Sequence, residues 1–147
     1  MLYKYKQLLE SYSNSNLYGT YYHGSKTKDL KYLEPQLDKR LGITGVFISN
    51  DKYHPMAFAL IPNSYNTSVN TTTKNGKFIK GTIISKDKLN DIGYLYTVTI
   101  NKDNVNYLKS YKNDGYYLTN KIKTDKIYEI SINNLFDLGF KIKYRQK

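Results

Sequence analysis

The chain contains no cysteine, so it can form neither disulfide bonds nor cysteine-based zinc sites. It lacks the run of about 20 apolar residues that a membrane-spanning helix needs, and residues 1–10 lack the apolar stretch of a secretion signal. The glycine patterns of Walker and Rossmann nucleotide sites are absent, and the two histidines form no cluster with metal-ligand spacing. We therefore expect a cytoplasmic protein that uses no metal and binds no membrane.

Tryptophan is also absent and alanine occurs only twice, so other residues must fill the core. The chain has 17 Tyr and 5 Phe among its 147 residues, and these large side chains bring enough apolar surface to favour a folded chain over a disordered one. A chain of this length buries roughly two thirds of the surface that its unfolded form exposes. A single tyrosine-rich domain over residues 1–147 accounts for the length.

Lysine gives the chain a formal charge of +11, from 21 Lys and two Arg against 12 acidic residues. The charge is uneven, because residues 63–147 hold 15 basic and 7 acidic side chains, a net charge of +8. Such a surface attracts nucleic acid or an acidic patch on a protein. AT-rich codon usage also produces a composition rich in Lys, Asn and Tyr, so compositional drift is the alternative explanation.

The pattern of apolar residues predicts an α+β fold. Residues 1–12 place Leu and Tyr at helical spacing, with a polar linker to residue 16, and Lys52–Ile61 predicts a second helix that Pro62 ends. Residues 63–75 contain one aliphatic side chain and predict a flexible loop, either a lid or a disordered segment. Residues 101–113 predict a short helix or loop. Strands are expected at 19–23, 44–49, 78–84, 94–100, 116–119, 127–132 and 140–144.

Two motifs stand at the ends of the first two expected strands. The first is Tyr-Tyr-His-Gly-Ser at 21–25, and the second is Gly-Val-Phe-Ile-Ser-Asn at 45–50, followed by Ala-Phe-Ala at 57–59. Residues 20–60 resemble the NAD-binding half of the ADP-ribosyltransferase superfamily, on the side of poly(ADP-ribose) polymerases and diphtheria toxin. The resemblance implies two packed, mostly antiparallel β-sheets with a few short helices, and a cleft that takes NAD as a substrate.

The resemblance also implies roles for five residues. His23 would hydrogen-bond the 2′-hydroxyl of the adenosine ribose, and the backbone of Gly24 would bind the nicotinamide carboxamide. Ser25 would lie beside the ribose. Phe47 takes the place of a tyrosine that stacks on nicotinamide, and a phenyl ring offers the same π face. Ser49, in the same motif, is a further candidate for cofactor binding.

A third element of the family is a glutamate near the start of a late strand, whose carboxylate stabilises the cationic sugar as nicotinamide leaves. The strand that matches best reads Tyr-Tyr-Leu-Thr at 116–119, which puts Tyr116 at the glutamate position. Glu129 is the acid inside a later strand and is the candidate catalytic acid, although its alternation with isoleucines also fits an exposed strand face. Asp114, just before the Tyr116 strand, is a further candidate.

These features favour an NAD-dependent mono-ADP-ribosyltransferase that modifies a protein or a nucleic acid. Small size and AT-rich composition suit a bacterial or phage effector, toxin or anti-defence protein in the cytoplasm of a bacterial host cell. The alternative is a binding module, catalytically inactive, that binds a nucleotide, nucleic acid or partner protein and inhibits it. A relative of the RNA 2′-phosphotransferases ranks below both, because that group needs a second histidine and arginines, of which only Arg40 and Arg145 are available.

Overall fold

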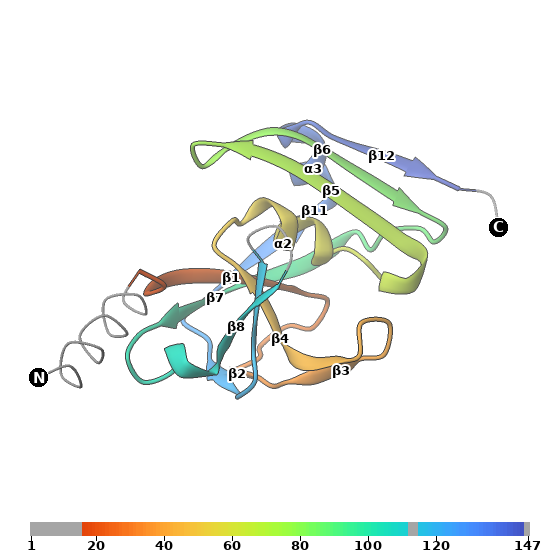
Figure 1. Cartoon of the computed structure of the whole chain (residues 1–147). Helices are drawn as coiled ribbons and strands as arrows, with labels where there is room; N and C mark the ends of the chain where they lie inside the picture. Colours follow the sequence, from red (N-terminus) through yellow and green to blue (C-terminus); the bar gives the residue numbers. More distant parts are fainter. Residues whose placement is uncertain (1–15, 112–114, 146–147) are drawn as a thin grey trace, which may run out of the picture.

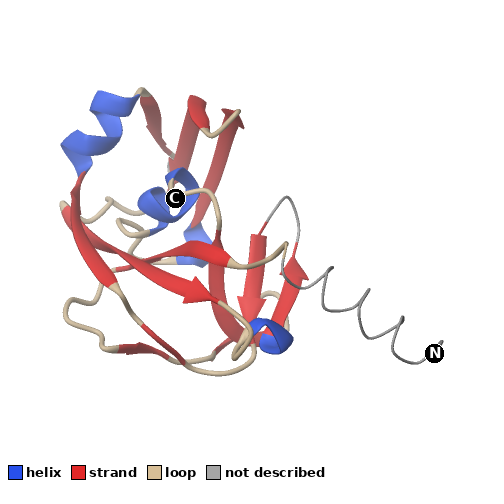
Figure 2. Ribbon diagram, turned by 90° about the vertical axis from the view of Figure 1, so that its left-hand side faces the viewer, coloured by secondary structure: helices blue, strands red, loops and turns tan. Residues whose placement is uncertain are grey.

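The computed structural model describes residues 16–111 and 115–145 and shows an α+β domain dominated by strands (Figures 1 and 2). Two short helices accompany the strands, α2 at Tyr53–Phe58 and α3 at Ile132–Leu138, together with 3-10 turns at Ser64–Asn66 and Val105–Tyr107. The strands are β1 Gly19–Ser25, β2 Tyr32–Leu33, β3 Gln36–Asp38, β4 Ile43–Ser49, β5 Thr67–Lys74, β6 Lys77–Ser85, β7 Ile92–Ile100, β8 Leu108–Tyr111, β9 Gly115–Leu118, β10 Ile122–Lys123, β11 Lys126–Ser131 and β12 Phe140–Tyr144.

The largest sheet has seven antiparallel strands in the order β11-β7-β1-β4-β9-β8, with β3 paired to β4. β1 pairs with β7 along its whole length, but its register with β4 holds at one pair, Tyr22 with Ser49. Beyond this pair β1 and β4 diverge. The sheet therefore divides into two halves, β1-β7-β11 and β3-β4-β9-β8.

Buried side chains from both halves meet in a first core. Alternation along β1 points Tyr21 into this core, while its neighbours Thr20 and Tyr22 lie on the opposite face. The Tyr21 hydroxyl donates to the carbonyl of Leu17, which satisfies its polar end. The first core consists of Tyr21, Leu33, Val46, Ile48, Tyr96, Val98, Ile100, Val105, Leu108, Leu118 and Ile122.

A second core lies on the other face of β1 and β7, where α2, α3 and a three-stranded sheet cover them (Figure 1). This sheet has the order β12-β6-β5, with β12 parallel to β6 and β5 antiparallel to it. Two glycines let α2 approach, because a Cβ at Gly24 would overlap the Pro55 carbonyl and one at Gly93 would overlap that of Ala59. The second core consists of Ala57, Leu60, Ile61, Ile83, Leu89, Leu95, Ile130, Leu135 and Phe140.

The prediction of a flexible loop at residues 63–75 is wrong, because most of this segment is strand β5, paired with β6. Its threonines and its valine are β-branched and favour extended backbone. The turn to β6 is Asn75-Gly76, with φ of 53° and 74°, the left-handed conformations that a two-residue hairpin turn requires. Alternate β5 side chains such as Val69 pack towards the second core.

The remaining predictions agree with the observed elements in some segments and differ in others. All seven expected strands are present, and 101–113 contains a 3-10 turn and strand β8. The helix expected over 52–61 ends earlier, at Phe58, because the amides of Leu60 and Ile61 bond three residues back instead of four. Helix α3 was not expected; Ser131 and Asn134 form a capping box at its start, and Gly139 ends it at φ 108°. The helix expected at residues 1–12 lies outside the described residues.

Neither α2 nor α3, nor any other helix in the described part of the chain, is long and apolar enough to cross a membrane. The expected α+β class is confirmed. The resemblance implies two packed sheets; the structure has a seven-stranded sheet that divides into two halves, a two-stranded sheet of β2 and β10, and the three-stranded sheet that closes the second core.

Leu135 tests how far the second core stabilises the domain. Its side chain is fully buried, so Leu135→Ala is expected to lower the free energy of unfolding by about 3 kcal/mol. Phe136 follows it on α3 with 53% of its surface exposed, and Phe136→Ala is expected to cost less than about 1 kcal/mol. Urea unfolding of both variants makes the comparison. Equal losses in the free energy of unfolding would show that α3 does not stabilise the domain through the second core.

Candidate functional site

A cleft opens where β1 and β4 part. It brings together His23 and Ser25 from β1 and Phe47 from β4, which the sequence had placed in two separate motifs. Its volume of about 590 Å³ lies within the range of small-molecule sites. We call it the His23 cleft. Its wall also includes Lys26, Glu34 and Tyr65.

The ring of His23 spans the gap between the two strands. Its Nδ1 lies 2.6 Å from the carbonyl oxygen of Phe47. A carbonyl only accepts, so Nδ1 carries the proton and donates, and the neutral ring keeps Nε2 as an acceptor. Burial lowers the pKa of His23, and the bond to Phe47 raises it by less. His23 is therefore a neutral ring of defined tautomer at neutral pH.

Phe47 is held by aromatic neighbours on its own half of the sheet. Its ring centroid lies 5.7 Å from that of Tyr111, edge to face, and 6.0 Å from that of Tyr117. Such contacts fix the plane of a ring. Ser25 lies on the opposite wall, where its Oγ accepts from the amide of Thr27 at 3.1 Å and retains its own proton to donate.

The segment after Ser25 is tied to the first core by a buried tyrosine. The Tyr96 hydroxyl donates to the carbonyl of Thr27 at 2.6 Å and accepts from the amide of Leu30 at 3.1 Å. Burial raises the pKa of Tyr96, which keeps this hydroxyl protonated. Thr124 adds a bond from its Oγ1 to the carbonyl of Leu30 at 2.7 Å. Tyr96 therefore positions the wall of the His23 cleft, a role with no signal in a sequence that has 17 tyrosines.

Two of the candidate cofactor residues have structural roles and do not line the cleft. Gly24 gives α2 the space to pack on β1, because any Cβ there would overlap backbone. The Ser49 Oγ accepts from the amide of Asp51 at 3.0 Å, and the Asp51 carboxylate accepts from that of Tyr53 at 2.9 Å. These two turns direct the chain from β4 into α2.

The candidate catalytic residues Tyr116 and Glu129 lie away from the His23 cleft. Tyr116 packs edge to face against Tyr21 at 5.5 Å, at the margin of the first core. Glu129 is exposed on β11, at the edge of the sheet, in register with Tyr94 of β7 and through it with Ser25. Two strand spacings, about 10 Å, therefore separate the backbones of Glu129 and Ser25. Asp114 lies outside the described residues.

Glu129 lines a second, larger depression of about 1020 Å³. It lies between α2, α3 and the face of β1-β7-β11 that points away from the first core. Lys52, Lys126, Asp125 and Asp137 also line it, so its charges are mixed. Apart from Glu129, none of the candidate site residues lines it. The volume alone does not make it the better site, and the His23 cleft has the defined hydrogen-bonding chemistry.

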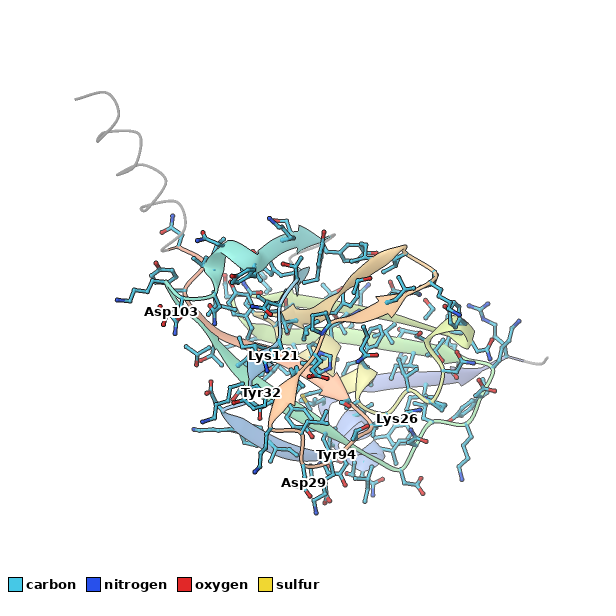
Figure 3. The ribbon with its side chains drawn as sticks, turned by 90° about the horizontal axis from the view of Figure 1, so that it is seen from below. Lys26, Asp29, Tyr32, Tyr94, Asp103 and Lys121 are labelled. Atoms are coloured by element: carbon cyan, nitrogen blue, oxygen red, sulfur yellow. The ribbon has the colours of Figure 1, made fainter. Side chains whose placement is uncertain are left out.

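Sequence reasoning missed three charged residues of the His23 cleft, Lys26, Glu34 and Asp38. The Asp38 carboxylate accepts from the backbone amides at 40 and 41 and forms an ion pair with Arg40. Lys26 follows Ser25 directly and is exposed in the loop after β1 (Figure 3). Glu34 directly follows β2 in the chain. Its position is therefore fixed by the pairing of β2 with β10, a strand from the C-terminal part of the sequence. Only the spacing of Glu34 from the first motif, eleven residues after His23, could have suggested it.

In residues 16–111 and 115–145, no group of three or more metal-ligating side chains could hold a metal ion. The second histidine, His54, stands on α2, where Thr71 Oγ1 lies 3.3 Å from its Nδ1. Burial lowers its pKa, and Asp51 raises it by less.

Comparison with known proteins yields no family model, no curated protein and no solved structure that matches the chain. The resemblance of residues 20–60 to ADP-ribosyltransferases is therefore carried by the two motifs alone. The geometry of the His23 cleft adds an observation that is independent of that resemblance.

The lowered pKa values of the two histidines predict a pH dependence of stability. Each binds a proton less readily in the folded chain than at its ordinary pKa of 6.5, so the unfolded chain takes up more protons below that pH. The free energy of unfolding should therefore fall as the pH drops from 7.5 to 5.5. In His23→Asn the fall should be smaller, because an amide can donate to Phe47 without titrating.

Urea unfolding at several pH values measures this dependence. His54→Gln is the matched control, which should remove the contribution of His54 and leave that of His23. A wild-type stability that is constant or rises on acidification to pH 5.5 would show that neither histidine is held neutral by the fold.

Proposed function

We propose that the chain binds NAD in the His23 cleft and transfers a single ADP-ribosyl group to a protein or nucleic-acid acceptor. The observation that carries the proposal is the bond between His23 and the Phe47 carbonyl, which joins the two motifs and leaves Nε2 as an acceptor. A sheet that parts between β1 and β4, with a core between its halves, agrees with the ADP-ribosyltransferase-like fold that the motifs imply.

The cleft offers a partner for each part of a dinucleotide. His23 Nε2 can accept a hydrogen bond from a ribose hydroxyl, because a neutral imidazole nitrogen without a proton is an acceptor. The Phe47 ring provides an apolar surface for nicotinamide. Lys26 supplies a cation for the pyrophosphate. Gly24 and Ser49, by contrast, would act only through the shape of the backbone around the cleft.

In the reaction, the bond between nicotinamide N1 and ribose C1′ breaks and its electron pair leaves with nicotinamide. The sugar becomes an oxocarbenium-like cation, an oxygen or nitrogen of the acceptor attacks C1′, and the proton of the acceptor passes to water. A fixed carboxylate would stabilise the cation. Glu34 lines the His23 cleft and is better placed for this than Glu129, which lines the other depression.

The position of Glu129 also favours a second candidate function. If neither Glu34 nor Glu129 reaches the scissile bond, the chain binds the dinucleotide without turning it over and acts as a binding module. Both glutamates are exposed to solvent, whereas electrostatic stabilisation of a cation is strongest in a site that excludes water.

The first test is calorimetric titration of NAD into the wild-type chain and into His23→Ala. Loss of one hydrogen bond and of the ring should weaken binding about tenfold or more. His54→Ala, which removes the histidine outside the cleft, should bind as the wild type does, and circular dichroism checks that each variant is folded. No binding by the folded wild type would refute the proposal.

The second test separates transfer from binding by measuring nicotinamide release. If Glu34 stabilises the cation, Glu34→Gln should slow release by about 100-fold with little change in NAD affinity, because the group acts on the transition state. Glu129→Gln is the matched control and should release nicotinamide as the wild type does. The reverse pattern assigns the role to Glu129, and tight NAD binding with no release by any form supports the binding module.

A further inference from the structure

The three-stranded sheet has an outer face that covers nothing in the described chain. Its inner face carries Ile83, Phe140 and Ile142 into the second core, so alternation turns the intervening side chains outwards. Register places these in cross-strand rows, one of Asn70, Thr82 and Lys141 and the next of Ser68, Ile84 and Lys143. Figure 1 shows this sheet as the uppermost layer, above α2. We call this surface the outer sheet face.

The charge around this face has one sign. Residues 67–86 and 138–145, which contain all three strands, include no acidic side chain. They contain seven basic side chains: Lys74, Lys77, Lys80, Lys86, Lys141, Lys143 and Arg145. None of the seven forms an ion pair with another residue that the structure describes. The carboxylate of Asp87, just beyond β6, accepts from the side-chain Nδ2 of Asn66 at 2.9 Å.

Like charges gathered on one small sheet repel each other and oppose folding. Lysine at a sheet edge also blocks pairing with another sheet, which explains basic residues on the edge strands β5 and β12. β12 pairs with β6 only from Gly81 to Ser85, so the same reason covers Lys77 and Lys80, where β6 has a neighbour on one side. It does not explain why no acid in residues 67–86 and 138–145 balances the seven cations. A partner that supplies negative charge accounts for this imbalance.

We propose that the outer sheet face binds the phosphodiester backbone of a nucleic acid. Lys80 pairs with Thr72, two positions before Thr82, so alternation puts it on the same face. Lys80, Lys141 and Lys143 provide the cations, and the neutral side chains between them, of the Ser, Thr and Asn type, are those that hydrogen-bond phosphate oxygens. A lipid surface is a poorer match, since Ile84 is the one apolar side chain in the two rows and is half-buried. Binding at this face does not require the His23 cleft.

The test is the binding of fluorescein-labelled mixed-sequence 20-mers, as duplex DNA, single-stranded DNA and single-stranded RNA, followed by anisotropy from 50 to 200 mM salt. If three lysines each neutralise one phosphate, affinity for the duplex should fall about 40-fold over this range, a slope of log K on log salt near −2.7, and about −2 for a single strand. The variant Lys80→Gln/Lys141→Gln/Lys143→Gln should lose most of the affinity and of the slope.

The matched control is Lys102→Gln/Lys109→Gln/Lys123→Gln, which removes the same charge from exposed positions on other elements. It should keep most of the affinity, as should His23→Ala, and urea unfolding checks that each variant is folded. Equal losses in the two triple variants would reduce the effect to net charge and overturn the proposal. So would the absence of binding to all three probes, or binding to anionic phosphatidylserine vesicles without binding to nucleic acid.

Discussion

The hydrogen bond from His23 to the carbonyl of Phe47 is the interaction on which the proposed site depends. β1 and β4 share a single registered pair, at Tyr22 and Ser49, and this side chain reaches across where the strands diverge. The bond fixes the tautomer of the ring, and burial keeps the ring neutral, so that Nε2 is presented as an acceptor. The first core, with Tyr96 tied to the segment after Ser25, holds the walls around it.

Most strands could be predicted from the sequence, because alternation and β-branched residues are local signals. The segment at 63–75 was misjudged by its polarity: its threonines favour a strand, and Asn75-Gly76 is a strong hairpin signal that should have outweighed the lack of aliphatic residues. Helix α3 has only seven residues and its capping signal at Ser131 is weak in sequence. The three-stranded sheet could not be predicted, because the parallel pairing of β12 with β6 joins segments more than fifty residues apart.

The motifs predicted that His23, Ser25 and Phe47 belong together, and the structure places all three in one cleft. Short motifs do not reveal which of their positions serve packing: the resemblance implies a ligand role for Gly24, whereas the approach of α2 by itself requires a glycine there. An acid cannot be assigned from strand order alone. Glu34 enters the cleft through the loop geometry of residues 26–38, which no periodicity encodes. The charge of the second half was visible in the sequence, but its concentration on one sheet depends on tertiary pairing.

The most direct test of this account is the ¹⁵N spectrum of the His23 imidazole, recorded between pH 5 and 8 with and without NAD. We expect a neutral ring protonated at Nδ1 with a bare Nε2, a pKa below the ordinary value of 6.5, and a shift of the Nε2 resonance when NAD is added. A ring protonated at Nε2, or one that titrates at its ordinary pKa and does not respond to NAD, would contradict the account.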